Sequence, residues 1–268
     1  MSEGMKVLDE SSPWDPTAIK TFGSAVLSVF DSQVASADAA SSAWLEQNNA
    51  GYLTLLPDDI DPVTVGPVLC AGLTSYKAVK NANVKAGDWV VVVGAGGGLG
   101  HLAVQYAVAQ GALVVGVDGG PAKGDFVKSV GAREYIDFMA TRDLVQKVVE
   151  LTNGGANAVI VAAGNVNAFS QAADMLKVGG TLSCVGIPAQ PGFVETPISS
   201  IVIKGLHITG NLVGSLKECL EAVDLVRRGI VKPKITVRDF ADLPAVYDEL
   251  EKGDVAGRIV LKIAKDDN

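Results

Sequence analysis

A glycine-rich turn between an apolar run and a helical pattern constrains this chain more than any other feature. The stretch VVVVGAGGGLGHLAVQYA, residues 90–107, places five glycines between four consecutive valines and a segment with helical spacing. A short β-branched run of this kind is typical of a strand buried on both faces of a parallel sheet. Because a strand, a glycine turn and a helix begin a βαβ unit, we expect a parallel sheet with crossover helices.

Strand-like and helix-like segments alternate after this turn. Further strand-like runs cover 113–118, 134–138, 157–164, 180–188 and 206–214, and helix-like runs cover 121–131, 142–152, 167–177 and 215–229. This alternation predicts an α/β fold with a doubly wound parallel Rossmann sheet. A C-terminal α+β tail over 234–263 need not belong to that sheet.

The chain divides by composition into three parts. Residues 1–50 include an Ala/Ser-rich stretch and are predicted to form an atypical N-terminal extension. Residues 51–232 are predicted to form the Rossmann domain, and residues 233–268 the C-terminal tail.

The overall charge excludes several classes of partner. The formal net charge is −8 and no Lys/Arg cluster interrupts it, which argues against binding to nucleic acid or to anionic membranes. The three cysteines, Cys70, Cys184 and Cys219, form no C-x-x-C pair, as expected in a reducing compartment. With a polar, acidic N-terminus and no apolar run long enough to cross a membrane, a cytoplasmic protein is expected.

The glycines match a dinucleotide-binding fingerprint in the register Ala95-x-Gly97-x-x-Gly100. In this register Gly97 lets the backbone approach a pyrophosphate and Gly100 lets the helix pack closely on the strand, with Gly98 and Leu99 between them. The pyrophosphate is expected at the helix N-terminus. Asp118 ends the next strand, 21 residues after Gly97 (118 − 97), where an acid accepts hydrogen bonds from the adenosine ribose. NAD is therefore expected rather than NADP; the alternative is a glycine-rich turn without a cofactor.

Several ordered motifs resemble one enzyme family. VLCAGLTSYKAVK, GAGGGLGHLAVQYA, GVDGG, GGANAVIVAAGN, GGTLSCVGIPA and EKGDVAGRIVLKI look like the medium-chain, zinc-dependent alcohol dehydrogenases of the yeast and fungal type. The similarity runs from about Tyr52 to Lys262. The resemblance implies cofactor contacts by Thr74, Val185, Ile187 and 211–214 near the nicotinamide, by Lys123 near the adenosine ribose, and by Arg258 near the pyrophosphate. For Lys123 and Arg258 the alternative is a solvated surface charge.

The family's N-terminal GroES-like domain has no counterpart in this sequence. Residues 1–50 contain neither Cys nor His, and the only histidines are His101 and His207. Cys70 resembles the family's last catalytic zinc ligand, but a catalytic zinc requires about three protein ligands. We therefore expect no zinc, with Cys70 as an orphan match.

Two patterns are weak candidates for acid/base chemistry. His101 lies at the start of the helix after the glycine turn, where a packing or backbone-bonding role is the alternative. Tyr76-x-x-x-Lys80 mimics the Tyr/Lys pair of short-chain dehydrogenases, in which the lysine lowers the tyrosine pKa. That pair normally follows the glycine turn and here precedes it, which favours coincidence.

Three functions remain open. The first is an NAD-binding, alcohol dehydrogenase-like oxidoreductase without the catalytic zinc, acting on an unknown alcohol or carbonyl. The second is a repurposed non-redox enzyme of isomerase, cyclase or decarboxylase type, and the third is a dinucleotide-binding pseudoenzyme. The resemblance also implies a homo-oligomer that pairs through the strand near 206–214.

Overall fold

The computed structural model describes residues 56–253 and 255–263. The chain divides into two compact units, Met1–Gly51 and Tyr52–Asn268, and every described residue belongs to the second. The predicted N-terminal extension, 1–50, lies outside the described residues.

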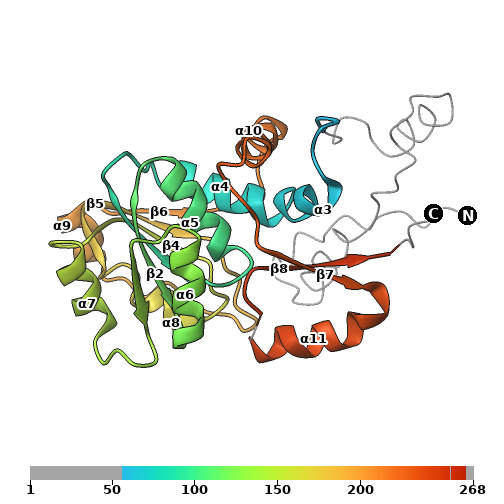
Figure 1. Ribbon diagram of the computed structural model, residues 1–268. Helices are drawn as coiled ribbons and strands as arrows, with labels where there is room; N and C mark the ends of the chain where they lie inside the picture. Colours follow the sequence, from blue (N-terminus) through green and yellow to red (C-terminus); the bar gives the residue numbers. More distant parts are fainter. Residues whose placement is uncertain (1–55, 254, 264–268) are drawn as a thin grey trace, which may run out of the picture. The chain divides into compact units, whose positions relative to one another are not determined.

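A six-stranded parallel sheet forms the centre of this unit (Figure 1). Its strands are β1 (Trp89–Val93), β2 (Leu113–Asp118), β3 (Glu134–Asp137), β4 (Ala156–Val161), β5 (Leu176–Cys184) and β6 (His207–Gly210). The order β3-β2-β1-β4-β5-β6 is that of a doubly wound Rossmann sheet, so the predicted fold class is confirmed.

Helices cover both faces of the sheet. The helices are α4 (Ala71–Asn81), α5 (Gly100–Ala109), α6 (Pro121–Ser129), α7 (Leu144–Leu151), α8 (Val166–Ser170), α9 (Ile198–Lys204) and α10 (Leu216–Arg227), and α3 (Pro62–Val65) and η3 (Gly66–Val68) precede α4. The valines of β1 explain the two layers, since Val90 and Val92 join the core under α4, α5 and α6, whereas Val91 and Val93 join the core under α7 and α8. Alternate side chains of a strand point to opposite faces, so a run of valines serves both cores.

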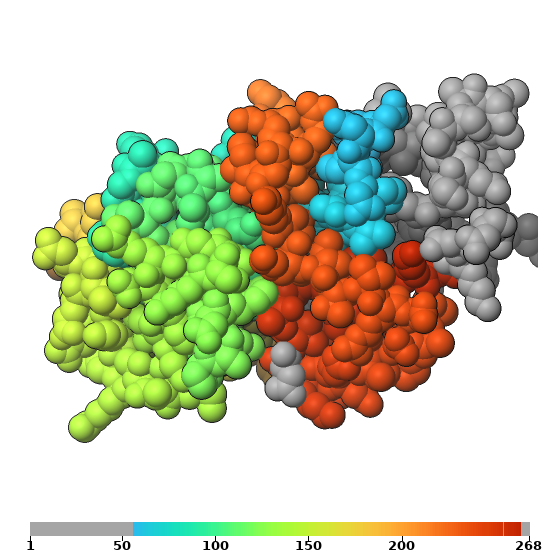
Figure 2. All heavy atoms as spheres, viewed as in Figure 1, coloured from blue at the N-terminus to red at the C-terminus, as the bar shows by residue number. Residues whose placement is uncertain are grey.

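The C-terminal residues form a separate element, which we call the ribbon. It consists of β7 (Ile235–Asp239), η4 (Phe240–Asp242), α11 (Leu243–Lys252) and β8 (Arg258–Lys262), with β7 and β8 paired in parallel as a two-stranded sheet. In the space-filling view the orange and red atoms of this part meet the green atoms of the Rossmann domain (Figure 2). The backbone joins the two where Gly257 N–H donates to the Gly96 carbonyl at 3.1 Å.

One predicted helix is shorter than its pattern indicates. The spacing over 167–177 predicted a continuous helix, but α8 ends at Ser170 and β5 begins at Leu176. Pairing with β4 explains the difference, because Leu176 lies opposite Ala156 in the sheet and is buried. Helix α9 was not predicted. No helix within the described part of the chain is long and apolar enough to cross a membrane.

Candidate functional site

The carboxyl edge of the sheet is the natural site for a ligand in this fold. The strand order reverses between β1 and β4, and ligands of doubly wound sheets bind in the crevice outside the strand ends at such a point. The loop between β1 and α5, residues 94–99, lies at this edge.

Two glycines of this loop allow the chain to turn tightly. Gly94 has φ +82°, and a Cβ there would lie 2.9 Å from the Ala163 amide nitrogen. At Gly100 a Cβ would collide with the Gly94 carbonyl oxygen and the Ala95 Cα. The start of α5 therefore packs directly on the end of β1. Ala95 itself is fully buried.

Arg258 of the ribbon lies on the glycine loop. A Cβ at Gly98 would lie 2.7 Å from Arg258 Cδ, whereas one at Gly97 would meet only the Gly94 oxygen at 3.4 Å. Burial lowers the pKa of the Arg258 guanidinium, and the charge of Cys70 acts in the opposite sense. The guanidinium has no hydrogen bond or ion pair with the described residues. Within the described residues, the Arg258 cation therefore lies beside Gly98 of the loop without a polar partner.

Asp118, at the end of β2, is buried and accepts three hydrogen bonds. Its Oδ2 accepts from Gly96 N–H at 2.8 Å, and its Oδ1 accepts from Gly119 N–H at 2.8 Å and from Lys123 Nζ at 3.1 Å. A carboxylate has about four lone-pair positions, so capacity for about one more donor remains. The structure thus joins Asp118 and Lys123, and Gly96 is a partner that the spacing did not indicate.

Tyr135 and Asp137 of β3 position the turn that follows Asp118. Asp137 Oδ1 accepts from Gly120 N–H at 3.0 Å, and the Tyr135 hydroxyl donates to the Gly120 carbonyl at 2.7 Å. Burial, together with the charges of Asp118 and Asp137, raises the pKa of Tyr135 to about 12. Sequence reasoning missed both residues, although an acid at the end of a third parallel strand was a usable signal.

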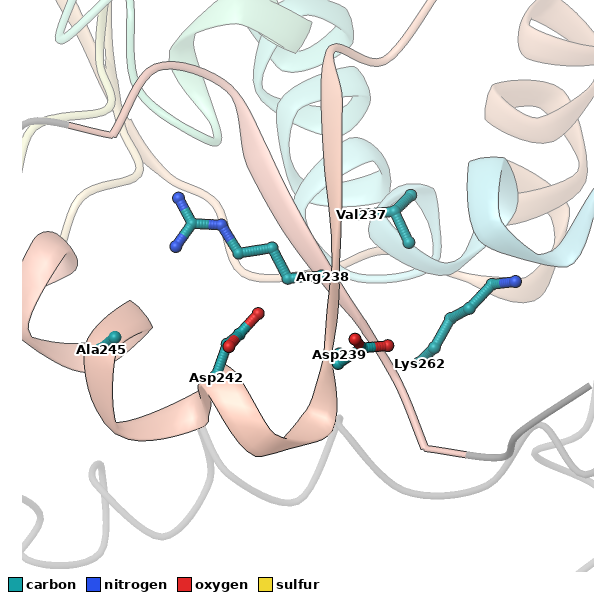
Figure 3. Close-up of a pocket in the computed structure, with 6 residues that line it drawn as sticks. All are labelled: Val237, Arg238, Asp239, Asp242, Ala245 and Lys262. Carbon is teal, nitrogen blue, oxygen red and sulfur yellow. The ribbon is translucent and has the colours of Figure 1, made fainter.

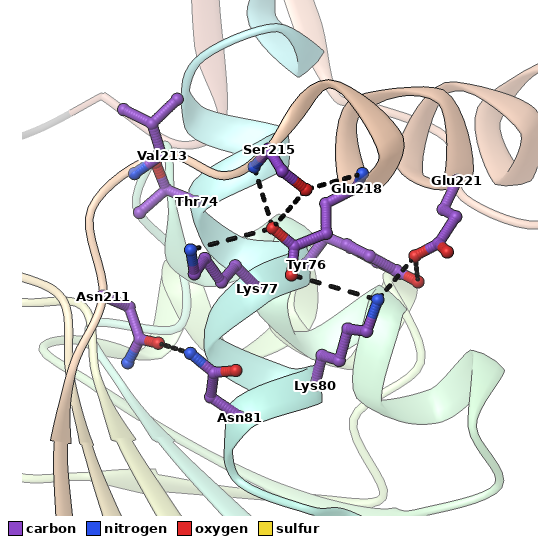
Figure 4. Close-up of polar contacts among 10 residues, drawn as sticks. All are labelled: Thr74, Tyr76, Lys77, Lys80, Asn81, Asn211, Val213, Ser215, Glu218 and Glu221. Carbon is purple, nitrogen blue, oxygen red and sulfur yellow. Dashed lines mark hydrogen bonds and ion pairs between the residues drawn. The ribbon is translucent and has the colours of Figure 1, made fainter.

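Thr74 connects α4 to the segment after β6 (Figure 4). Its hydroxyl donates to the Cys70 carbonyl at 2.8 Å and accepts from Val213 N–H at 3.1 Å. Val213 has φ +50°, which is strained for a β-branched residue, so this hydrogen bond stabilises a costly turn. Val185 is buried and Ile187 is 53% exposed beyond the end of β5.

His101 is a buried link between α5 and the segment that enters β7. Its Nδ1 lies 2.9 Å from the Gly97 carbonyl oxygen, and its Nε2 lies 3.2 Å from the Lys234 amide nitrogen. Burial lowers its pKa to about 4, and the charges of Arg258 and Lys234 add to the effect. With both ring nitrogens engaged and no exposed surface, His101 is poorly placed to exchange a proton with a substrate.

Tyr76 and Lys80 bind a carboxylate of α10 rather than forming a proton-transfer pair (Figure 4). The Tyr76 hydroxyl and Lys80 Nζ both donate to Glu221 Oε2 at 2.7 Å. Burial, and then the hydrogen bond to Glu221, raise the pKa of Tyr76, whereas a catalytic tyrosine needs a lowered one. These contacts favour the interpretation that the Tyr76-x-x-x-Lys80 spacing matches the short-chain dehydrogenase pair by coincidence.

Cys70 precedes α4 and is half-buried. Within residues 56–253 and 255–263, no three His, Cys, Asp or Glu side chains are grouped so that they could bind a metal ion. Cys70 contributes to no such group in this part of the chain, and it interacts electrostatically with Arg258.

A hollow of about 600 Å³ lies in the ribbon, and no residue of the glycine loop lines it (Figure 3). Its lining is Val237, Arg238, Asp239, Asp242, Ala245 and Lys262. Glu249 binds the Arg238 guanidinium through two hydrogen bonds of 2.7 and 2.9 Å. Since the ligand edge of this fold lies at the glycine loop, we do not assign the cofactor to this hollow.

The strand order, the glycine loop and the acid at the end of β2 define a dinucleotide-binding α/β domain. Comparisons with known proteins identify its family. Residues 98–228 match the family model described as zinc-binding dehydrogenase. An alcohol dehydrogenase of Schizosaccharomyces pombe (strain 972 / ATCC 24843) is 40% identical over 217 residues, which cover 81% of this chain and 62% of that protein. The chain belongs to the zinc-binding dehydrogenase family, and the described unit is an alcohol dehydrogenase-like NAD(P)-binding domain.

Solved structures agree with this assignment. The alcohol dehydrogenase of the archaeon Aeropyrum pernix superimposes with a TM-score of 0.71 at 33% identity, over 78% of this chain and 61% of that one. A cinnamyl alcohol dehydrogenase of Sorghum bicolor gives a TM-score of 0.66 at 26% identity, over 79% and 60%. The chain thus spans about three fifths of the length of these relatives.

Proposed function

We propose that this chain binds NAD at the glycine loop and belongs to an oxidoreductase that acts on an alcohol or carbonyl. The observation that carries the proposal is the buried Asp118 carboxylate, which accepts a hydrogen bond from Gly96 of the loop and keeps acceptor capacity for a ribose hydroxyl. Its negative charge disfavours the 2′-phosphate of NADP. Bound NAD supplies the hydride-transfer chemistry, and the protein supplies binding and orientation.

Arg258 supports the same site from the ribbon side. Its guanidinium lies beside Gly98 and has no partner of its own among the described residues. A diphosphate is a fitting partner, because guanidinium groups and free backbone N–H groups both favour phosphate oxygens. Lys123 Nζ lies 3.1 Å from Asp118 Oδ1, so we assign its ammonium group to the same ribose.

We further propose that the oxidoreductase works without the family's catalytic zinc. The support is the ligand set: the sequence contains two histidines and three cysteines, and both nitrogens of His101 are engaged. A zinc ion polarises a carbonyl and lowers the pKa of an alcohol, so its loss costs several kcal/mol of transition-state stabilisation. Zinc-dependent alcohol oxidation by this chain is therefore expected to be absent or very slow.

A dinucleotide-binding protein without turnover is the second candidate. It is favoured by the state of the acid/base candidates, since His101 is inaccessible and Tyr76 has a raised pKa. No contact found in the described residues favours the non-redox enzyme named among the open functions.

Calorimetry with NAD and NADP, followed by assays with alcohols and carbonyls, tests these proposals. We expect NAD to bind more tightly than NADP, and we expect Asp118→Ala to lower the affinity for NAD. Absence of heat with NAD would overturn the cofactor assignment. A change in NADH absorbance with a carbonyl favours the oxidoreductase, and binding without turnover favours the second candidate. Stoichiometric zinc in the purified protein would contradict the zinc-free proposal.

We also propose a homo-oligomer formed at the β6 edge of the sheet. Strand β6 ends the sheet order, and apolar side chains nearby are exposed: Ile198 79%, Val202 73%, Ile203 79% and Leu212 74%. An exposed strand edge and a large apolar patch together favour an interface between copies. Light scattering should show a dimer or larger species, and Val202→Glu should reduce it. A monomeric wild-type chain at high concentration would disprove the interface.

The cytoplasmic location stays a prediction. Cys70, Cys184 and Cys219 are in no disulfide bond, which supports it, because reducing compartments preserve thiols. Imaging of a tagged chain tests it directly.

A further inference from the structure

A chain of hydrogen bonds connects the glycine loop to the ribbon through His101. The Lys234 N–H, which precedes β7, donates to His101 Nε2, and the Lys234 carbonyl accepts from Arg258 N–H at 2.9 Å. Next to Arg258, Gly257 N–H donates to the Gly96 carbonyl of the loop at 3.1 Å. The path begins and ends on the glycine loop, and Arg258 is part of it.

The two bonds of His101 assign its ring. The Lys234 amide can only donate, so Nε2 must be the acceptor, and Nδ1 then carries the hydrogen that is donated to the Gly97 carbonyl. A charged ring would carry a hydrogen on both nitrogens and lose the bond to Lys234. The groups that face the ring are the Arg258 and Lys234 cations and the Phe126 ring, with centroids 6.0 Å apart. Neither cation favours a charged imidazole.

We propose that His101 is a positioning residue that, as a neutral imidazole, fixes the ribbon against the glycine loop and thereby holds Arg258 where the cofactor diphosphate binds. The inference rests on the proposed NAD site. It assigns to His101 an action through Arg258 rather than a contact with cofactor or substrate, because the ring has no exposed surface.

Gln105 supplies a matched control one turn further along α5. Its Oε1 accepts from Lys232 N–H at 2.7 Å, and its Nε2 donates to the His101 carbonyl at 3.1 Å. The bond to Lys232 also joins α5 to the segment before β7, but Lys232 does not bond to Arg258 or to the glycine loop. Comparing the loss of the His101–Lys234 bond with the loss of the Gln105–Lys232 bond therefore separates positioning of Arg258 from simple attachment of the segment.

Four variants and one double variant test the proposal by calorimetry with NAD. His101→Asn can place an amide at Nδ1 but offers Lys234 no acceptor, whereas His101→Gln can place an oxygen at Nε2. We expect H101N to weaken NAD roughly tenfold, which is the upper range for one hydrogen bond, and H101Q and Gln105→Met to weaken it only about two- to threefold. If His101 acts only through Arg258, H101N should cause almost no further loss of NAD affinity in the Arg258→Ala background. A purely structural role would instead give additive losses.

The outcomes separate this inference from the proposed function. Suppose that the wild-type chain binds NAD and that H101N either keeps the full affinity or loses as much affinity in the R258A background as in the wild type. Either result overturns the positioning role and leaves the NAD site intact. Absence of binding by the wild-type chain overturns both.

Hydrogen exchange on the unmutated chain tests the inference should H101N fail to fold. The amides of Lys234, Gly257 and Arg258 should exchange as one unit that NAD slows, with a smaller change at Lys232. Independent exchange of these three amides would contradict the proposal.

Discussion

Two polar networks join separate elements of this domain, and they differ in their access to water. The loop network comprises Gly96, Gly97, His101, Asp118 and the backbone of Lys234. His101 and Asp118, whose side chains take part, are 0% and 8% exposed. The helix network comprises Tyr76, Lys80 and Glu221, with Lys80 and Glu221 side chains 41% and 33% exposed. Buried polar groups are costly to leave without partners, whereas exposed ion pairs contribute about 0–1 kcal/mol. We therefore expect function to depend on the first network and hardly on the second.

The largest effect should come from removing the close packing beneath the loop network. Gly100→Ala places a methyl group against the Gly94 carbonyl, so either β1 or α5 must move. We expect a loss of several kcal/mol in unfolding free energy, measured by urea denaturation, and loss of NAD binding. Gly97→Ala is the control, because its Cβ would be 3.4 Å from the nearest atom. Equal stability of both variants would refute the packing argument.

The second largest effect should be a loss of stability at acid pH caused by His101. Its folded pKa of about 4 lies below the ordinary 6.5, so between these values the unfolded chain binds a proton that the folded chain does not. The contribution of neutral His101 to the unfolding free energy is therefore complete above about pH 6.5. It is lost as the pH falls toward 4, by up to about 3 kcal/mol. Urea titrations between about pH 7 and pH 5 measure the slope.

The control for this slope is His101→Gln, which cannot titrate. It should show a flatter profile than the wild type over the same range. An identical profile would mean that other groups cause the acid sensitivity.

Asp118→Asn should have an intermediate effect on stability and a clear one on the cofactor. Asparagine has one oxygen, so it cannot accept from Gly96, Gly119 and Lys123 as the carboxylate does. We expect a loss of about 1–3 kcal/mol in stability and about tenfold in NAD affinity, with NADP weakened less. Parallel calorimetry with both nucleotides measures the preference. An unchanged NAD-to-NADP ratio would argue against a ribose contact.

The smallest effect should come from the helix network. Glu221→Gln removes the shared acceptor of Tyr76 and Lys80, and we expect a loss of no more than about 1 kcal/mol, with NAD binding unchanged. The pKa of Tyr76 should fall without becoming normal, because burial is the larger cause of its rise. Ultraviolet titration measures this pKa. Lys147→Gln, on exposed α7, is the control, and a loss of NAD affinity in E221Q alone would remove the contrast between the networks.

Features that depend on neighbouring residues in the sequence were predicted correctly, whereas a feature that depends on a distant strand was not. The valines of β1, the glycines after them and Asp118 at the next strand end are local features, and they predicted the parallel sheet and the expected cofactor edge. The helix predicted over 167–177 was too long because the pairing of Leu176 with Ala156 overrides helical spacing. The site residues themselves stay predictions until a cofactor is measured.

Sequence by itself determined the fold class, the position of the glycine loop and the resemblance to zinc-binding dehydrogenases, because strand period, turn chemistry and motif order are written over short stretches. Only the tertiary structure decided what His101 and Tyr76 do. Their partners, Lys234 and Glu221, lie 133 and 145 residues away. A side chain's proton affinity depends on burial and on such distant neighbours, so it is established only when the chain has packed.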